Sequence, residues 1–289
     1  KRMNGEIISA DSRYIYRGMD IGSAKPSLEE RENIPHYMID IANPDEVWSL
    51  AQYFSQSKQV ISEVIAREKL PIVVGGTGQY IRALTEGWSV PVSEPNPKLR
   101  KILSDWGEEI GANTLYEKLA VLDPDACSFI DPTNVRRTIR ALEVILCTGE
   151  KFSAQRKKTP PENDFWIIGL SRPRQELYER VDRRIEKMFE DGLIEEVATL
   201  MQKGYGPDLP SMSAIGYREV AQYLMGKMTH EEAKILMRRN TRKFIRRQNN
   251  WFKPEDPTIH WYSMENDPID KICTDLHNNF IHGGAQNDK

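Results

Sequence analysis

The sequence has few cysteines, no long apolar run and no signal-peptide pattern. Its three cysteines, Cys127, Cys147 and Cys273, are far apart and form no CxxC pair, so the sequence suggests neither a zinc site nor a disulfide framework. Such cysteine usage is typical of a reducing compartment. No apolar run approaches the roughly 20 residues that a membrane helix needs. We therefore expect a cytoplasmic protein without a membrane partner.

The chain also lacks a net positive charge. It has 40 Lys and Arg against 43 Asp and Glu, giving a formal net charge of −3. Any nucleic-acid surface must then be a local patch. No internal repeat or low-complexity tract interrupts the 289 residues. That length suffices for one large domain, or for a core domain with an insertion.

Strand patterns and helix patterns alternate over most of the chain. Short apolar or β-branched runs predict strands at 6–10, 37–41, 70–74, 165–170 and 258–262. Amphipathic patterns predict helices at 49–68, from Gln79 onward, and at 173–190, 193–203, 213–225, 229–253 and 268–280. The run 70–74 is apolar throughout, which predicts burial on both faces. The alternation predicts an α/β fold whose parallel sheet is covered by helices, with the late strand completing that sheet.

The segment 90–160 carries helix patterns only. Its beginning is punctuated by Pro91, Pro95 and Pro97, as in a linker. Helices are predicted at 97–110, 114–122, 125–129 and 134–147, before a polar stretch that ends at 164. We predict a catalytic core formed by 1–89 and 161–289, a helical insertion at 90–160, and a disordered tail after Gly283.

An aspartate follows the first predicted strand. Ser12, Arg13 and Tyr14 come directly after Asp11. Open α/β sheets bind their ligands at the carboxyl ends of the strands. A carboxylate with hydroxyls, a cation and an aromatic face nearby suits a general base held beside an anionic, aromatic ligand. A cap or turn role for Asp11 is the alternative.

A glycine-rich turn, 75–78, follows the strand 70–74. Backbone N–H groups can approach an anion there, and the helix that follows adds partial positive charge. Strand-to-helix turns use Gly and Thr in any case, so a plain turn is the other interpretation. If the two strands are neighbours, the hydroxyl of Thr77 shares a crevice with Asp11.

Arg180 and Arg184 lie four residues apart in the predicted helix 173–190. They therefore share a face and could clamp a pyrophosphate. The acids that alternate with them make a solvated, salt-bridged face the default interpretation.

The stretch from Lys234 to Lys253 contains eight basic residues and no acid. Helical spacing places six of them on one half of the helix: Arg238, Arg239, Arg242, Lys243, Arg246 and Arg247. The other half carries Met237, Phe244 and Trp251, which predicts a core contact opposite a basic stripe. The missing acids favour a phosphate backbone over a solvated face. Arg136, Arg137 and Arg140 form a second cluster of this kind.

Seven segments resemble, in the same order, segments of the tRNA dimethylallyltransferase family. They include DSRYIYRGMDIGSAKP at 11–26, LPIVVGGTGQYIRAL at 70–84 and TRKFIRRQNNWF at 241–252. The others lie at 36–41, 134–149, 176–197 and 213–220. The resemblance covers nearly the whole chain except loops and tail. The sequence has no zinc-finger tail, as in the bacterial or organellar type.

This resemblance implies transfer of a dimethylallyl group from dimethylallyl diphosphate to N6 of adenosine 37 in tRNA. The implied fold is a P-loop NTPase-like core with an all-helical insertion. By this resemblance Asp11 is the general base, Thr77 lies beside the reaction centre, and Arg184 holds the pyrophosphate. The i,i+4 spacing adds Arg180 to the pyrophosphate-binding residues. Contacts with tRNA are implied for Ser12, Arg13, Tyr14, Arg136, Arg137, Arg140, Ser213, Gly216, Tyr217, Arg218, Arg246, Arg247, Gln248 and Trp251. Mg²⁺ is the expected cofactor, with no ligand assigned among these residues, and a monomer is expected.

One part of the family pattern does not occur in the sequence. The phosphate loop GxTxxGK[ST] is expected about one helix upstream of Glu6. We expect that the sequence lacks a segment that the protein has, since a sheet without its first strand would expose an apolar edge. The chain of 289 residues should then have little or no transferase activity, and a version with the upstream segment should be active. Equal turnover by the two would refute this.

Three other functions stay open. An adenylate isopentenyltransferase would prenylate a free nucleotide, but it would not need the insertion or the basic helix. A non-catalytic remnant would bind tRNA without forming product. A nucleotide kinase is a third possibility, against which the basic helix and the absence of a lid pattern argue.

Overall fold

The computed structural model describes residues 1–89, 95–155 and 158–278. They form two compact units, one of Lys1–Ile81 with Asn163 onward and one of Arg82–Glu162. The second unit begins earlier than the predicted boundary at 90, within a helix. Pro91 and the predicted disordered tail lie outside the described residues.

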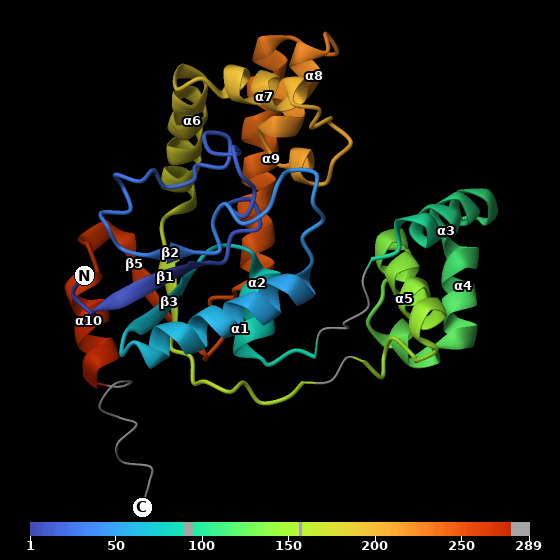
Figure 1. Cartoon of the computed structure of the whole chain (residues 1–289), viewed down its shortest axis with the longest axis horizontal. Helices are drawn as coiled ribbons and strands as arrows, with labels where there is room; N and C mark the ends of the chain where they lie inside the picture. Colours follow the sequence, from blue (N-terminus) through green and yellow to red (C-terminus); the bar gives the residue numbers. More distant parts are fainter. Residues whose placement is uncertain (90–94, 156–157, 279–289) are drawn as a thin grey trace, which may run out of the picture. The chain divides into compact units, whose positions relative to one another are not determined.

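A parallel sheet forms the centre of the first unit. Its strands are β1 (Gly5–Ser9), β2 (His36–Tyr37) and β3 (Leu70–Val74), in the order β2-β1-β3 (Figure 1). Ile7 pairs with His36 on one side and with Ile72 on the other. The α/β class with a parallel sheet is confirmed. β2 is shorter than the predicted 37–41 because Met38 and Asp40 adopt positive φ angles of 61° and 55°, which an extended strand does not allow.

The late strands form a separate pair. β4 (Ile167–Ser171) and β5 (Ile259–Ser263) are parallel, with Gly169 opposite Trp261. In the described part of the chain this pair is not hydrogen-bonded to the β1–β3 sheet, so the prediction that the late strand completes one sheet is wrong. The predicted burial of 70–74 on both faces is also wrong, since Val74 is 52% exposed. Val74 is the last residue of β3, where the chain leaves the sheet for the 75–78 turn.

One helix packs against the β1–β3 sheet, and a second one follows β3. α1 (Leu50–Ala66) begins at Ser49, whose hydroxyl accepts from the Gln52 N–H while the Gln52 side chain returns to the Ser49 backbone. This capping box satisfies helix-end donors. α2 (Gly78–Thr85) follows β3 directly. Tyr53 of α1 stacks on Tyr80 of α2, with ring centroids 3.7 Å apart, and so joins the two helices.

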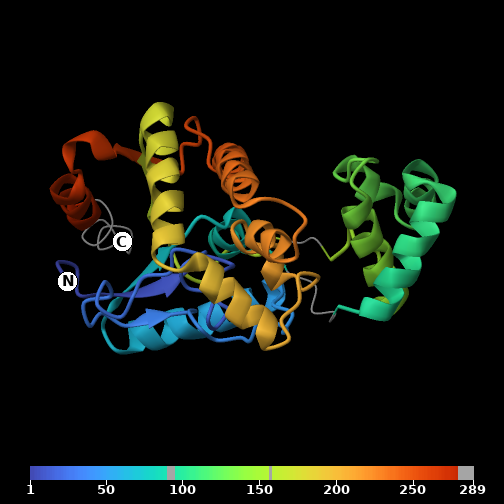
Figure 2. The ribbon, with the colours of Figure 1, turned by 90° about the horizontal axis from the view of Figure 1, so that it is seen from above.

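Helices α6 (Arg174–Glu190), α7 (Leu193–Gln202), α8 (Tyr217–Leu224) and α9 (His230–Trp251) follow one another after β4, drawn from yellow to orange in Figure 2. α6 packs against α7 and α9, and α8 packs against α7 and α9. A short 3₁₀ helix, Ser211–Ser213, precedes α8, and another, Met264–Asn266, precedes the terminal helix α10 (Ile269–Leu276). The predicted end of α10 at Phe280 lies outside the described residues. No helix described here combines the length and apolar character that a membrane span requires.

The second unit is helical around its own core. It contains α3 (Pro97–Ile110), α4 (Ala112–Leu122), a 3₁₀ helix (Pro124–Ser128) and α5 (Val135–Thr148). Leu103, Leu115, Leu119 and Leu142 are almost fully buried at its centre. The predicted helix 125–129 is therefore a 3₁₀ turn. Its first turn is capped by the buried Asp123, whose carboxylate also accepts from the Ser153 N–H (2.7 Å) and hydroxyl (2.6 Å).

The chain enters and leaves the second unit through neighbouring residues. The Thr159 N–H donates to the Gly87 carbonyl at 2.8 Å, Trp88 forms an isolated bridge with Lys158, and Lys158 pairs with Glu86. These contacts hold the two connecting segments together.

Candidate active site

Asp11 lies two residues after β1. Its carboxylate accepts from the Arg13 N–H at 2.8 Å, and its own N–H donates to the Ser9 hydroxyl at 3.2 Å. Burial raises the pKa of Asp11 above its ordinary value. The hydrogen bond from the Arg13 N–H and the positive charge of Arg13 act in the other direction and lower that pKa by less. Within the described residues Asp11 makes no ion pair. Asp11 thus has the local contacts of a turn residue, together with a carboxyl group whose proton affinity is increased.

Thr77 lies beside this segment because β1 and β3 are neighbours. The Thr77 N–H donates to the Ala10 carbonyl at 3.2 Å. The Thr77 hydroxyl accepts from the Ser12 N–H at 3.1 Å, which leaves its own O–H as a donor. The two residues predicted at one crevice are therefore at adjacent strand ends. Their roles in catalysis stay predictions.

Each of the three glycines of the 75–78 turn faces a different neighbour. A Cβ on Gly75 would lie 2.3 Å from the Ala10 carbonyl atoms, and one on Gly76 would lie 2.1 Å from the Gln248 amide nitrogen. One on Gly78 would lie 2.2 Å from the Trp251 ring. Packing alone thus explains Gly75 and Gly78, whereas at Gly76 the contact atom is the end of a flexible side chain. Anion binding by the turn stays a prediction.

The segment after Asp11 is held by its polar side chains. The Arg13 guanidinium donates to the carbonyls of Pro210 (3.1 Å) and Ser211 (3.3 Å). The Tyr14 hydroxyl donates to the Ala24 carbonyl at 2.7 Å, and burial raises the pKa of Tyr14 to about 12. In this structure both polar groups are used within the protein, and tRNA contacts of Ser12, Arg13 and Tyr14 stay predictions.

Two residues that the sequence argument missed fix the rest of this loop. Glu196 of α7 accepts from three consecutive N–H groups, those of Asp20 (3.0 Å), Ile21 (2.8 Å) and Gly22 (3.1 Å). The Lys25 side chain is 2% exposed and donates to Asp20 and Asp40 at 2.6 Å each. No sequence pattern indicated either residue, because the partners of Glu196 lie far away along the chain.

The Tyr217 hydroxyl donates to the same Glu196 carboxylate at 2.6 Å. Tyr217 is fully buried, and burial together with Glu196 raises the pKa of its hydroxyl. Gly216 is also buried. Among the predicted tRNA contacts of this segment, Ser213 is exposed and Arg218 is partly exposed, so a surface contact is open to these two. The Tyr217 side chain is buried beneath this surface.

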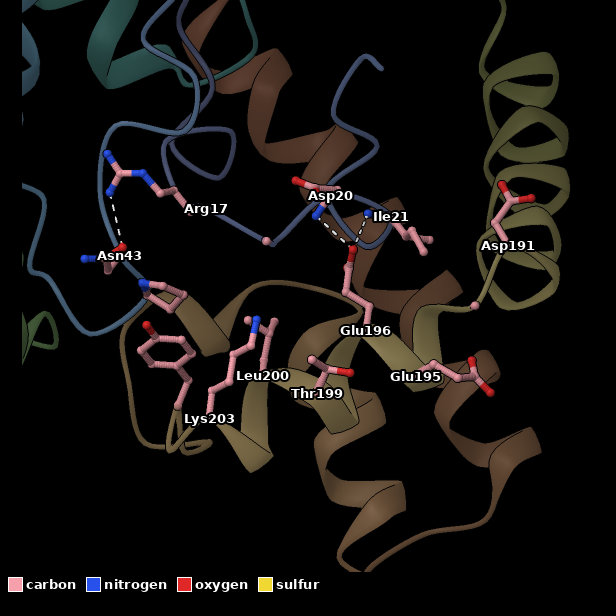
Figure 3. A pocket seen from close by; sticks show the side chains of 14 residues that line it. Arg17, Asp20, Ile21, Asn43, Asp191, Glu195, Glu196, Thr199, Leu200 and Lys203 are labelled. Atoms are coloured by element: carbon pink, nitrogen blue, oxygen red, sulfur yellow. Dashed lines mark hydrogen bonds between the residues drawn. The ribbon is translucent and has the colours of Figure 1, made fainter. Parts of the chain in front are cut away.

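A pocket of about 620 Å³ lies next to Glu196, between the 17–21 loop and α7. Figure 3 shows Glu196 reaching the N–H groups of Asp20 and Ile21 at its wall. The charged residues that line it are Arg17, Asp20, Asp191, Glu195, Glu196 and Lys203. Carboxylates outnumber cations, which disfavours a diphosphate or a phosphate backbone. Asp11 and Thr77 do not line this pocket.

Arg180 and Arg184 are exposed on α6. The positive charge of Arg184 is close enough to Tyr14 to oppose the rise of that phenol's pKa. In the part of the chain that the structure describes, no carboxylate pairs with either arginine. Both remain open to an anionic ligand, and the pyrophosphate clamp stays a prediction.

The basic stripe of α9 is partly neutralised by α6. Lys234 and Arg238 pair with Glu186, and Arg242 pairs with Asp182 at 2.6 Å. α6 thus supplies acids that the α9 sequence itself lacks, so the absence of acids no longer argues for phosphate contact at these three residues. Contact of the stripe with a phosphate backbone stays a prediction. The exposed basic residues are Arg239, Lys243, Arg246 and Arg247.

The predicted core face of α9 is only partly buried. Met237 is 1% exposed, but Phe244 is 44% and Trp251 39% exposed. The prediction of a core contact along this face is therefore wrong beyond Met237. The physical reason is that α8 and α6 pack on the first half of the helix, whereas the end of α9 meets the 75–78 turn.

The arginine cluster of α5 lies in the second unit. Arg136 and Arg137 are exposed, and Arg137 lies over the Phe129 ring at 5.9 Å. Arg140 pairs with the buried Glu143 of the same helix at 2.5 Å. Contacts of these arginines with tRNA stay predictions.

A metal ion would need a set of donor side chains close to one another. Residues 1–89, 95–155 and 158–278 bring together no three His, Cys, Asp or Glu side chains able to hold one. Within these ranges the side chains thus do not form a Mg²⁺ site by themselves, and Mg²⁺ as cofactor stays a prediction.

Comparison with known proteins gives a consistent result. The profile of a family described as IPP transferase matches residues 14–255. A tRNA dimethylallyltransferase of Roseiflexus sp. (strain RS-1) is 47% identical over 88% of this chain and 83% of its own length. One of Dehalococcoides mccartyi is 43% identical over 97% of this chain and 86% of its own length.

Two solved structures are also similar. The tRNA isopentenylpyrophosphate transferase of Bacillus halodurans has a TM-score of 0.68 and 38% identity, covering 98% of this chain and 88% of that one. A eukaryotic dimethylallyltransferase acting on tRNA has a TM-score of 0.81 and 26% identity, covering 98% of this chain and 74% of that one.

Proposed function

This chain belongs to the IPP transferase family, and on that premise we propose that it prenylates tRNA. The acceptor is N6 of adenosine 37 and the donor is dimethylallyl diphosphate. Its relatives at 43% to 48% identity are bacterial tRNA dimethylallyltransferases. The observation that carries the proposal on this chain is the placement of Asp11 and Thr77 at adjacent strand ends, with the pKa of Asp11 raised.

Asp11 acts on the acceptor. The exocyclic amine of adenine is a weak nucleophile because its lone pair is delocalised into the ring. A carboxylate within hydrogen-bond reach orients the amine and accepts its proton as the new C–N bond forms. A raised pKa makes Asp11 a stronger base than an exposed aspartate. The Thr77 hydroxyl, already accepting from Ser12, donates to the substrate beside it.

The other half of the reaction is the departure of diphosphate. Negative charge develops on the leaving oxygen as the allylic C–O bond breaks, and fixed positive groups stabilise it. Arg184 and Arg180 are exposed cations on α6, Arg184 acts on the pKa of Tyr14, and the two supply this charge. The purine must leave its stack to reach Asp11, and exposed Arg246 and Arg247 hold the phosphate backbone nearby.

The test is prenyl transfer by the protein expressed from its complete gene. Labelled dimethylallyl diphosphate is offered with tRNA and, separately, with AMP. We expect label in tRNA and none in AMP. The Asp11→Asn variant should lose about 10²- to 10⁴-fold in kcat, as removal of a general base does, with little change in tRNA affinity. Label in AMP would indicate an adenylate isopentenyltransferase, and tRNA binding without product would indicate a remnant.

The pH profile provides a separate prediction for Asp11. The base works only when ionised, so kcat/KM should fall as the pH drops through the pKa of Asp11. Because burial raises that pKa, the fall should occur at higher pH than for an exposed aspartate. The residual activity of Asp11→Asn should lack this acidic limb. A wild-type profile without it, measured under conditions where the chemical step limits the rate, would contradict the assignment.

A further inference from the structure

The end of α9 is docked on the turn that carries Thr77. The Gln248 side-chain N–H donates to the Gly76 carbonyl at 3.2 Å, and the space where Gly76 and Gly78 lack side chains is filled by Gln248 and Trp251. These two contacts lie one residue before and one residue after Thr77. Figure 1 shows α9 running down to the beginning of α2.

We propose that Gln248 and Trp251 form a latch that positions Thr77, and that their part in the reaction is this placement rather than contact with tRNA. The proposal rests on the proposed function. It gives these residues a different role from the one that the family resemblance implied.

The physical argument is one of fixed geometry. Thr77 is held from the strand side by Ala10 and Ser12, and the latch holds its two neighbours from the helix side. A hydroxyl fixed on both sides keeps one orientation toward a substrate, which lowers the entropy that the reaction must lose. Trp251 packs on the turn with one part of its ring and remains 39% exposed.

The latch also connects Thr77 to the basic surface of α9. Arg246 and Arg247 are exposed and directly precede Gln248. A phosphate bound by these arginines would act on the same helical turn that contacts Gly76. Binding of the backbone and placement of Thr77 are therefore mechanically linked through less than two turns of one helix.

The first experiment separates kcat from KM. In Gln248→Glu, which is the same size but cannot donate to the Gly76 carbonyl, kcat should fall about tenfold or more, while KM for tRNA stays within about twofold. Trp251→Ala should behave in the same way, and Trp251→Phe should recover most of the rate. The control Arg247→Gln should instead raise KM for tRNA. A rise of KM in Gln248→Glu without a decrease of kcat would overturn the latch in favour of direct tRNA contact.

A double-mutant cycle provides a second, independent test. Gly76 has no positive φ, so Gly76→Ala is compatible with its backbone, but the new Cβ would displace the Gln248 amide. Gly76→Ala should therefore lower kcat as Gln248→Ala does, and the double variant should be no worse than either one. Multiplicative decreases in kcat would overturn the latch.

Hydrogen exchange makes the test independent of activity. Removal of the latch should speed amide exchange in 75–80 in the free protein, with no change around α5. Unchanged exchange would overturn the latch even if the wild type transfers prenyl groups. A wild type that forms no prenylated tRNA would refute the proposed function, whereas faster exchange in the variants would still support the latch.

Discussion

The two arginine-rich helices, α5 in one unit and α9 in the other, look alike in sequence but differ in how their charges are balanced. On α5, Arg140 pairs with Glu143, which lies on the same helix and has a side chain only 1% exposed. On α9, Arg238 and Arg242 pair with acids of α6 whose side chains are 41% and 37% exposed. One cluster is thus organised around a buried carboxylate and the other around a surface ion-pair network.

This difference shows that the net charge of a helix face depends on the acids that pair with it, which lie on the same helix in α5 and on a neighbouring helix in α9. The Glu143 carboxylate also accepts hydrogen bonds from the Arg100 guanidinium at 2.8 Å and from the Asn96 N–H at 2.7 Å. It therefore joins the beginning of α3 to the middle of α5. Burial alone would raise the pKa of Glu143, but hydrogen bonds from Arg100 and Arg140 outweigh it and lower that pKa. Arg140 of the α5 cluster therefore stabilises its unit, and the exposed Arg246 and Arg247 of α9 remain open to a ligand.

The largest effect is expected from removing the buried carboxylate. Glu143→Ala leaves Arg100 and Arg140 without their shared acceptor and should cost about 2 kcal/mol of unfolding free energy, at the low end for a buried pair because the arginines can rehydrate. The matched change in the other helix pair, Glu186→Ala, should cost less than about 1 kcal/mol, as for exposed ion pairs. Urea unfolding measures both. Equal costs would remove the distinction between the two clusters.

A smaller effect is expected from the exposed end of α9. Arg246→Gln with Arg247→Gln should weaken tRNA binding, and the slope of log affinity against log salt should become shallower by about one for each phosphate that the variant no longer neutralises. The control pair Arg238→Gln with Arg242→Gln should change that slope little, because those cations are already paired with acids of α6. Filter binding over a salt series measures it. A larger slope change in the control pair would reverse the assignment.

The smallest effect is expected from removing the acids of α6 that pair with α9. Asp182→Asn with Glu186→Gln releases Arg238, Arg242 and Lys234 from their partners. Affinity for tRNA at low salt should then rise a few-fold, about 0.5 kcal/mol, within the range of weakly screened surface charges. Binding measured at low and at high salt should show the gain only at low salt. No gain at low salt would mean that these cations are too far from the bound backbone.

Much of the site could be predicted from the order of strands and helices along the chain. Parallel neighbours place the ends of β1 and β3 at one edge, so Asp11 and Thr77 could be predicted to meet. α3 has the predicted bounds because Asn96 caps it and Pro97 occupies its first position, and both signals are local. The roles of Arg184 and of the basic tRNA-contact residues were suggested by spacing and charge pattern and made specific by the family resemblance, and they stay predictions.

The missed features depend on partners distant in sequence. Glu196 binds N–H groups more than 170 residues earlier, and no periodicity indicates such a contact. The exposure of Phe244 and Trp251 depends on where α6 and α8 stop covering α9. The separate β4–β5 pair could not be distinguished from a continuation of the first sheet, because strand patterns do not specify which strands are neighbours.

The hydrogen bond between Thr159 and Gly87 makes the helical insertion an exchangeable cassette. Its entry and exit points touch, so a shorter or longer module could be grafted between them without rethreading any strand. Such a graft would leave the strand ends that bear Asp11 and Thr77 untouched.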